Sequence, residues 1–283
     1  MRHRFKNIHK PLIILFLAFG FSASLNAGVS AYFNCGAFNT PQNRPFLETY
    51  LTIVGKSLFA KETNGHYQCS VNIVCTIFKD SAIVKANKYN LLGPEFNDKE
   101  GEISFIDNQR YSLPNGIYTI ELSLTDNYSP GSKPFVIKET VQLAFSTKEL
   151  QSSSIQLLES FKKAAVPGPI SKSGYDLVPY TVNYYPESVK DLSFYFEAYN
   201  TDTILGSGKP FIYYYYLETS NNFVKLESYG SFKKQKASKI NPLLDKIDIG
   251  KLSTGNYNLV IEIKDANNIT HLQKKIFFRY GIP

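Results

Sequence analysis

The sequence predicts an all-β protein built from two similar halves. The pattern Leu-x-x-Gly-x-Tyr occurs at residues 113–118 and again at residues 252–257. Each copy leads into a run in which apolar and polar residues alternate, which is the period of a strand buried on one face. Similar short runs recur along the chain between clusters of Gly, Pro, Asn and Asp, as in proteins made of strands and turns.

The two copies of the pattern are interpreted as tyrosine corners, in which a phenol hydroxyl bonds back to the turn before its strand. Gly116 and Tyr118 carry the first copy, and Gly255 and Tyr257 carry the second; all four are expected to be structural. The copies lie 252 minus 113, or 139, residues apart, which fits a sandwich of about 100 residues plus a linker. The sequence therefore predicts two tandem immunoglobulin-like β-sandwich domains.

Residues 1–27 are predicted to be a signal peptide. They begin with basic residues, continue with an apolar run at 12–21 that is short for a membrane span, and end in a suitable cleavage site before Gly28. This organisation predicts an exported protein that is periplasmic, associated with the outer membrane, or extracellular. An uncleaved membrane anchor is the alternative.

The net charge of the mature chain excludes one class of partner. The whole chain has 31 Lys+Arg and 24 Asp+Glu, a formal charge of +7. Arg2, Arg4, Lys6 and Lys10 belong to the signal peptide, so 27 minus 24 leaves +3 for the mature chain. Nucleic-acid-binding domains are usually far more basic. No nucleic-acid partner is therefore predicted.

The first sandwich is expected at residues 28–148 and the second at residues 175–283. In the first, strands are expected at 46–54, 67–78, 83–91, 103–106, 118–124 and 135–145. In the second, they are expected at 177–185, 192–199, 211–218, 223–229, 257–263 and 273–278. Residues 149–174, rich in Lys, Ser, Gly and Pro, are assigned to a linker whose Ile155, Leu157 and Leu158 dock on one domain. Within this segment, residues 153–164 fit a strand as well as a helix.

The three cysteines do not form an evident disulfide framework. Cys69 and Cys75 share the parity of the buried residues of one strand, and six strand residues span about 20 Å, which is too far for a disulfide between them. Cys35 could form a disulfide with one of these two cysteines. We favour the alternative, in which all three are buried free thiols.

Several chemistries are excluded by residue content. His66 and His271 are the histidines of the mature chain, and neither lies in a nucleophile motif or in zinc-ligand spacing. The Gly-Ser-Gly-Lys run at 206–209 lacks the spacing and the helix of a phosphate-binding loop. No cofactor is predicted.

Oxygen ligands collect at the same position in the two halves. Asp126 and Asn127 close one hairpin, and Asp265 and Asn267 close the equivalent one. Such clusters can hold calcium, but Asp and Asn are also the common residues of turns, and few acids converge here. They are weak calcium candidates, and no metal site is assigned.

Tyrosine and lysine define a possible binding surface, at Tyr213, Tyr214, Tyr215, Tyr216, Lys233, Lys234 and Lys236. Four consecutive tyrosines in one strand must place one pair on each face. The outward pair either contacts a protein or a sugar ring, or packs on the linker or the other domain. The lysine run is either a solvated loop or a contact for an anionic partner such as an acidic glycan.

Five stretches of the chain resemble a known family. Residues 108–118, 154–159, 174–180, 194–201 and 253–262 are similar to the amino-terminal β-sandwich region of GWxTD-domain-containing proteins of Bacteroidota envelopes. The namesake Gly-Trp-x-Thr-Asp segment would follow the second sandwich, but the sequence contains no tryptophan. Either this is a short relative without that module, or the resemblance covers only the sandwiches. The resemblance implies an envelope compartment and no particular reaction.

These observations together predict a non-catalytic binding or scaffold protein of the cell envelope. Its partner is expected to be another envelope protein, or a glycan, and membrane association is expected only through a partner. One alternative is a carbohydrate-binding module, which requires the outward tyrosines to form a flat exposed row. Another is a hydrolase using carboxylates such as Glu197 or Asp191, which requires two acids roughly 5 to 10 Å apart in one cleft.

Overall fold

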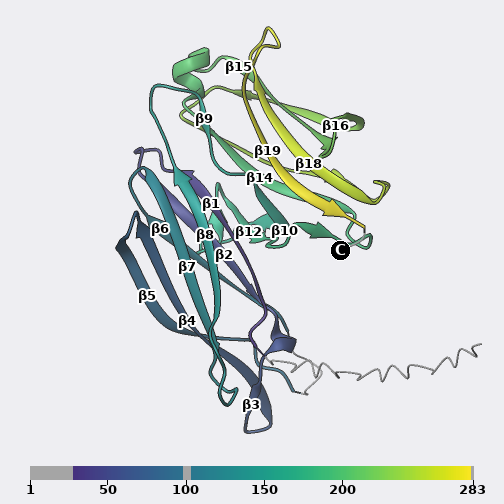
Figure 1. Cartoon of the computed structure of the whole chain (residues 1–283). Helices are drawn as coiled ribbons and strands as arrows, with labels where there is room; N and C mark the ends of the chain where they lie inside the picture. Colours follow the sequence, from purple (N-terminus) through teal and green to yellow (C-terminus); the bar gives the residue numbers. More distant parts are fainter. Residues whose placement is uncertain (1–27, 98–102, 282–283) are drawn as a thin grey trace, which may run out of the picture.

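The computed structural model describes residues 28–97 and 103–281, so the predicted signal peptide lies outside the described residues. The described chain is all-β and forms two tandem immunoglobulin-like sandwiches that lie against each other (Figure 1). Within the described residues, no helix is both long enough and apolar enough to cross a membrane.

The first sandwich consists of two antiparallel sheets. One sheet has the order β1 (Ala31–Asn39), β2 (Pro45–Ile53) and β6 (Phe105–Ser112). The other contains β3 (Ala60–Thr63), β4 (His66–Lys79), β5 (Ala82–Leu92), β7 (Gly116–Asp126) and β8 (Phe135–Leu143). A single 3-10 turn, Gly55–Ser57, follows β2. The alternation read in the sequence holds for β4, where Cys69 and Cys75 are both 2% exposed in the core.

The second sandwich also has two sheets, but its first sheet is larger. That sheet contains β9 (Gln151–Ser152), β10 (Gln156–Lys163), β11 (Ser171–Lys172), β12 (Tyr175–Pro179), β14 (Asp191–Tyr199) and β17 (Ile240–Asp248). The other has the order β13 (Tyr184–Tyr185), β19 (Thr270–Tyr280), β18 (Gly255–Lys264), β15 (Pro210–Thr219) and β16 (Lys225–Lys236). A π-helical turn, Asp202–Gly206, follows β14. Only the β13–β19 pairing is parallel among the described strands.

The segment assigned to a linker is corrected by the structure. Residues 149–174 contribute β9, β10 and β11, and β10 pairs with both β14 and β12. Ile155 and Leu157 are buried in the core of the second sandwich, while Leu158 packs between the sandwiches. These apolar side chains gain burial when the backbone is extended beside β14, which accounts for β10, whereas Pro167, Gly168 and Pro169 lie in the connection between β10 and β11.

Two further differences concern strands that sequence periodicity did not reveal. β1, β3 and β17 were not predicted, and the expected strand at 177–185 is divided into β12 and β13. The division occurs because the chain crosses from one sheet of the second sandwich to the other between these two strands.

The two tyrosine corners are present as predicted. The hydroxyl of Tyr118 donates to the carbonyl of Pro114 at 2.8 Å. The hydroxyl of Tyr257 donates to the carbonyl of Ser253 at 2.7 Å. A Cβ atom at Gly255 would lie 3.1 Å from the Tyr257 hydroxyl, which explains why a glycine precedes the corner tyrosine.

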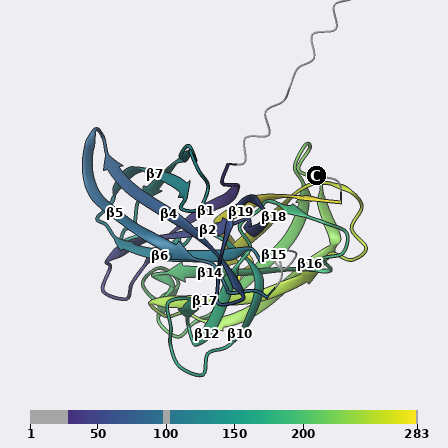
Figure 2. The ribbon, with the colours of Figure 1, turned by 90° about the horizontal axis from the view of Figure 1, so that it is seen from below.

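The two sandwiches share an order of strands. The sheet order β5–β4–β7–β8 of the first corresponds to β16–β15–β18–β19 of the second, and β2–β6 corresponds to β14–β17. The sandwiches meet through an apolar cluster of Phe38, Leu158, Leu177 and Tyr195, each less than 2% exposed. Figure 2 shows from a second direction that the sheet carrying β1, β2 and β6 lies against the sheet carrying β10, β12, β14 and β17.

Candidate functional site

Two of the four consecutive tyrosines are core residues. Tyr213 is 0% and Tyr215 is 2% exposed. The Tyr213 hydroxyl donates to the carbonyl of Asn241 at 2.5 Å, and the Tyr215 hydroxyl donates to the carboxylate of Asp245, so both phenols link the two sheets of the second sandwich. Their assignment to a binding surface is therefore wrong, because the side chains of Tyr213 and Tyr215 lie on the face of β15 that packs against the core.

The other pair lies on the outer face of the sheet but does not form a flat exposed row. Tyr216 is only 8% exposed, and the ring of Tyr214 is 5.3 Å from it. The ammonium of Lys225 lies over both rings, at 4.8 and 5.3 Å, and that of Lys264 lies 4.9 Å from the Tyr214 ring. These lysine side chains cover the aromatic faces that a sugar ring would need.

The basic run lies on a strand and not in a loop. Lys233, Lys234 and Lys236 are exposed residues of β16, which continues seven residues beyond the predicted end at 229. The Lys233 ammonium pairs with Asp245 at 2.9 Å and donates to the carbonyl of Leu244 at 3.0 Å. Lys233 therefore ties the edge of one sheet to the other.

The weak calcium candidates organise turns. The carboxylate of Asp126 accepts the backbone N–H groups of Phe59 and Tyr128, both at 2.8 Å, and Asn127 donates its amide to Ser70. The Asp265 carboxylate accepts the N–H groups of Asn267 and Ile269, both at 2.9 Å, in the equivalent hairpin. Within the described residues, no three His, Cys, Asp or Glu side chains group as metal ligands.

The structure reveals a buried charge cluster between the sandwiches that sequence analysis missed. Glu48, on the outer face of β2, is completely buried. Its carboxylate forms an ion pair with Lys172, accepts the Tyr50 hydroxyl at 2.6 Å, and pairs with the Arg110 Nε at 2.7 Å. Lys172 comes from the second sandwich, so this ion pair joins residues 124 positions apart.

A tight turn places Lys172 in the interface. β11 and β12 are joined by Ser173 and Gly174, whose φ angles are +50° and +84°. Two residues with positive φ make the turn that joins adjacent antiparallel strands most compactly. The hairpin directs the Lys172 ammonium to 3.7 Å from the centre of the Phe38 ring.

The second sandwich carries an equivalent carboxylate. Glu197 occupies the outer face of β14 and accepts the hydroxyls of Tyr195 and Tyr199, the latter at 2.5 Å. The pattern Glu-x-Tyr is thus present on β2 at Glu48 and Tyr50 and on β14 at Glu197 and Tyr199. This repeat is visible in the sequence and was the signal that could have indicated the interface.

Burial and neighbouring charges shift the pKa values of Glu48 and Lys172 in opposite directions. Burial alone would raise the pKa of the Glu48 carboxyl, but the charges of Lys172 and Arg110 outweigh it, and the pKa lies below its usual value. Burial lowers the pKa of Lys172 to about 8, against the opposing effects of Glu48 and Glu197. The cluster is therefore an ion pair at neutral pH that holds the sandwiches together.

The carboxylates proposed for a hydrolase do not share a cleft. Asp191 and Glu197 lie six residues apart on β14, or roughly 20 Å along the strand. Asp191 forms a surface ion pair with Lys246 at 2.8 Å, and both oxygens of Glu197 accept phenol hydroxyls. Glu48 and Glu197 are closed off in the interface, with exposures of 0% and 7%.

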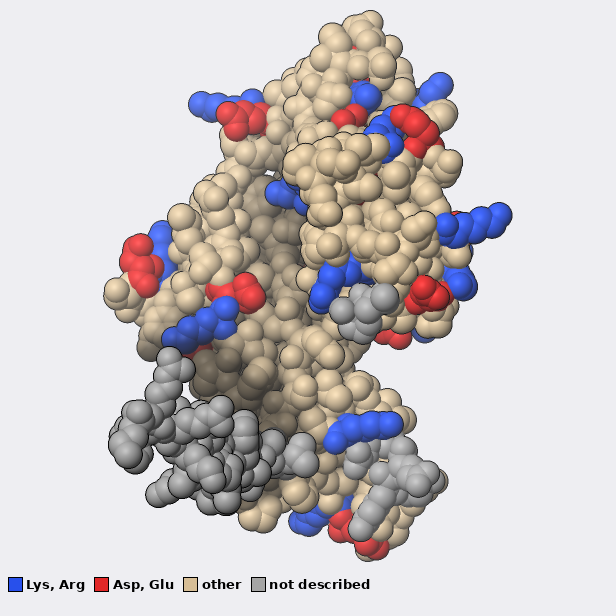
Figure 3. All heavy atoms as spheres, turned by 45° about the vertical axis from the view of Figure 1, so that its right-hand side comes forward, with Lys and Arg blue, Asp and Glu red and all other residues tan. Residues whose placement is uncertain are grey.

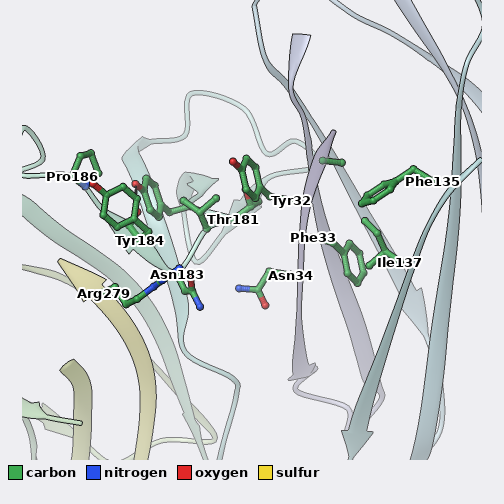
Figure 4. A pocket seen from close by; sticks show the side chains of 13 residues that line it. Tyr32, Phe33, Asn34, Phe135, Ile137, Thr181, Asn183, Tyr184, Pro186 and Arg279 are labelled. Atoms are coloured by element: carbon green, nitrogen blue, oxygen red, sulfur yellow. Dashed lines mark hydrogen bonds between the residues drawn. The ribbon is translucent and has the colours of Figure 1, made fainter. Parts of the chain in front are cut away.

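An open cleft of about 800 Å³ lies beside this interface. Its walls come from both sandwiches and include four segments: residues 31–34 of β1, Phe135 and Ile137 of β8, residues 180–184 with Pro186, and Arg279 of β19. Figure 3 shows the molecular surface hollowed between the two sandwiches. In Figure 4, β1 runs through the cleft, with Phe135 and Ile137 on one side of it and Thr181, Asn183 and Arg279 on the other.

The cleft is lined by aromatic, aliphatic and amide side chains. Tyr32 is 49% exposed and Phe135 is 40% exposed. Asn34 and Asn183 lie on opposite sides of the opening (Figure 4). None of these residues was predicted as a site, because they come from segments that are separated by up to 248 positions, from 31 to 279.

No family model and no curated protein sequence matches the chain. Among solved structures, the calcium binding domain CBD12 of CALX1.1 is similar with 13% identity over 84% of this chain and 82% of that chain, at a TM-score of 0.24. The fibronectin(III)-like modules of Clostridium thermocellum CbhA are similar with 7% identity over 83% of this chain and 85% of that chain, at a TM-score of 0.22. At these TM-scores the likenesses carry no conclusion about function. The fold of this chain, two tandem immunoglobulin-like β-sandwiches, therefore rests on its own sheets and cores.

Proposed function

We propose that this chain is an exported, non-catalytic binding protein that acts as a scaffold in the cell envelope through protein–protein contacts. The observation that carries the proposal is the cleft whose walls are supplied by both sandwiches. The adjoining interface combines an apolar cluster with the Glu48–Lys172 ion pair, so the two walls have a defined spacing. A preformed cleft of this kind lowers the entropic cost of binding a partner.

The remaining parts of the proposal rest on residue patterns. The amino-terminal basic and apolar pattern supports export. The five stretches similar to GWxTD-domain-containing proteins support a place in a Bacteroidota envelope. A non-catalytic role is supported by the use of Glu48 and Glu197 in the interface and by the separation of Asp191 from Glu197.

Co-purification from native envelopes tests the proposal. The chain is produced with its amino-terminal segment and a carboxy-terminal tag, cross-linked mildly, purified, and analysed by mass spectrometry. An exported protein of similar size with the same tag serves as the control. We expect a stoichiometric protein partner with this chain that is missing from the control, and an amino terminus at Gly28.

Two results would count against the proposal. Recovery of the chain alone, or with only glycan attached, would contradict a protein scaffold. Recovery from the cytoplasm with an intact amino-terminal segment would contradict export.

A further inference from the structure

One edge of β1 offers unpaired backbone groups to the cleft. The Val54 N–H donates to the Ser30 carbonyl, and the register continues as Tyr32 with Thr52 and Asn34 with Tyr50. In an antiparallel ladder, hydrogen-bonded pairs alternate with non-hydrogen-bonded pairs. Even-numbered residues of β1 therefore bond to β2, and the N–H and C=O groups of odd-numbered residues point away from it.

The second sandwich already occupies the far half of this edge. The Ala37 N–H donates to the Ser154 hydroxyl at 3.0 Å, and the Ala37 carbonyl accepts the Ser154 N–H at 2.9 Å. The Asn39 N–H donates to the Tyr199 hydroxyl at 3.0 Å. This edge of β1 can thus pair with an extended segment, because residue 154 does so within the same chain.

The near half of the edge has no such partner. Within residues 28–97 and 103–281, the outward N–H and C=O groups of Ala31 and Phe33 bond to no other group. The Cys35 N–H is satisfied by the side chain of Asn34 at 2.8 Å, which ends the open stretch. Ala31 and Phe33 both line the cleft. An open strand edge of this kind is a template for a strand from another chain.

The walls of the cleft indicate which side chains such a strand would carry. Phe135 and Ile137 of β8 present apolar surface on one side of β1. On the other side lies Arg279, which has no carboxylate within 4.0 Å among the described residues and lies near Asn183 (Figure 4). Alternate residues of an added strand point to opposite sides. One set of side chains of the added strand would therefore contact the apolar surface of Phe135 and Ile137. The other set would face the Arg279 guanidinium, which has no ion-pair partner among the described residues.

We propose that the near edge of β1 binds an extended peptide segment of a partner protein by strand addition, with apolar and acidic residues in alternation. This inference rests on the proposed binding function and specifies its site and the class of its ligand. Backbone hydrogen bonds to Ala31 and Phe33 supply the pairing, and Arg279 selects an acidic side chain.

A library of linear peptides of about twelve residues, displayed and selected against the chain from Gly28 onward, tests the proposal. We expect the enriched sequences to alternate apolar and acidic residues. N-methylation of a selected peptide at alternate positions should weaken its binding about tenfold or more, while methylation at the intervening positions should have little effect. This period of two distinguishes strand addition from contact by side chains alone.

A matched pair of variants locates the binding edge. Ala31→Pro removes the outward N–H at the first residue of an edge strand, where proline is tolerated, and Ala31→Ser keeps that N–H. We expect Ala31→Pro, but not Ala31→Ser, to lose about tenfold or more in affinity for the selected peptide, with both unfolding at the wild-type temperature. Arg279→Glu should shift the selection from acidic to basic peptides.

Failure of this inference and failure of the proposed function give different results. Enrichment of no peptide, or equal binding to the Ala31→Pro and Ala31→Ser variants, overturns strand addition. If the native partner co-purifies equally with Ala31→Pro, the scaffold function stands and its site lies elsewhere. If no native partner is found but the selected peptides bind with the expected period, the edge is a peptide site and the proposed scaffold role fails.

Discussion

The hydroxyl of Tyr199, on β14 of the second sandwich, accepts the backbone N–H of Asn39, on β1 of the first, at 3.0 Å. The same hydroxyl donates to Glu197 at 2.5 Å, and the Tyr199 ring packs edge-on against Phe145 of the first sandwich at 5.5 Å. A single phenol therefore satisfies a strand edge of one domain and a buried carboxylate of the other. The Tyr199 side chain thus links the two sandwiches through buried polar and aromatic contacts.

Tyr199→Phe should destabilise the protein by about 1 to 3 kcal/mol. The substitution keeps the ring but leaves the Asn39 N–H and one oxygen of Glu197 without their partner in a buried site. Urea unfolding measures the change. Tyr32→Phe removes the hydroxyl of a tyrosine that is 49% exposed and should leave the transition unchanged. Equal stability of the two variants would show that the Tyr199 hydroxyl does not couple the domains.

Lys172→Met should cost about 3 kcal/mol or more, because it leaves Glu48 buried with only part of its compensation. The unfolding transition should also become less cooperative, since the ion pair joins the two sandwiches. Lys246→Met is the matched control. It breaks the exposed pair with Asp191 and should not shift the unfolding midpoint measurably. A midpoint for Lys172→Met that equals the control would contradict a stabilising role for the buried pair.

Acid should weaken the interface through Glu48. The charges of Lys172 and Arg110 outweigh burial and hold the pKa of this carboxyl below its value in the unfolded chain, so the unfolded state binds more protons as pH falls. The resulting stabilisation is fully present above about pH 4.5, the usual value for a glutamate, and is lost as pH falls through the folded-state pKa.

Comparison with Glu48→Gln measures this effect. The stability difference between wild type and Glu48→Gln should be largest at neutral pH and should shrink as pH falls below about 4.5. Glu159→Gln, which removes an exposed carboxylate, serves as the control. A difference that stays constant from pH 7 to pH 3 would mean that the Glu48 carboxyl does not titrate as the ion pair requires.

The two tyrosine corners should respond alike. Tyr118→Phe and Tyr257→Phe each remove one hydrogen bond to a turn carbonyl, at Pro114 and Ser253 respectively. Each substitution should cost about 1 kcal/mol. The double variant should show the sum of the two losses within about 0.5 kcal/mol, because the corners lie in separate domains. A large excess loss would indicate that the corners are coupled through the interface.

Local periodicity was enough to place several structural residues. Tyr118 and Tyr257 bond as a repeated motif predicts, and Cys69 and Cys75 share the core of the first sandwich because they share a strand parity. The parity of residues 213–216 also showed that two tyrosines must face outward, but not which two. That choice depends on which face of β15 meets Asn241 and Asp245 of the opposite sheet.

By itself, the sequence determined that the chain is all-β, that it is duplicated, and where most strands lie, because alternation and turn residues act within a few positions. Tertiary structure alone decided that the segment 149–174 contributes strands to the second sandwich, that Glu48 meets Lys172, and that Ala31, Phe135 and Arg279 line one cleft. A strand of mixed composition is extended only when a neighbour buries its apolar side. A buried charge is tolerated only where a distant residue compensates it. Both conditions depend on segments brought together by folding, so a local pattern such as Glu-x-Tyr does not by itself decide them.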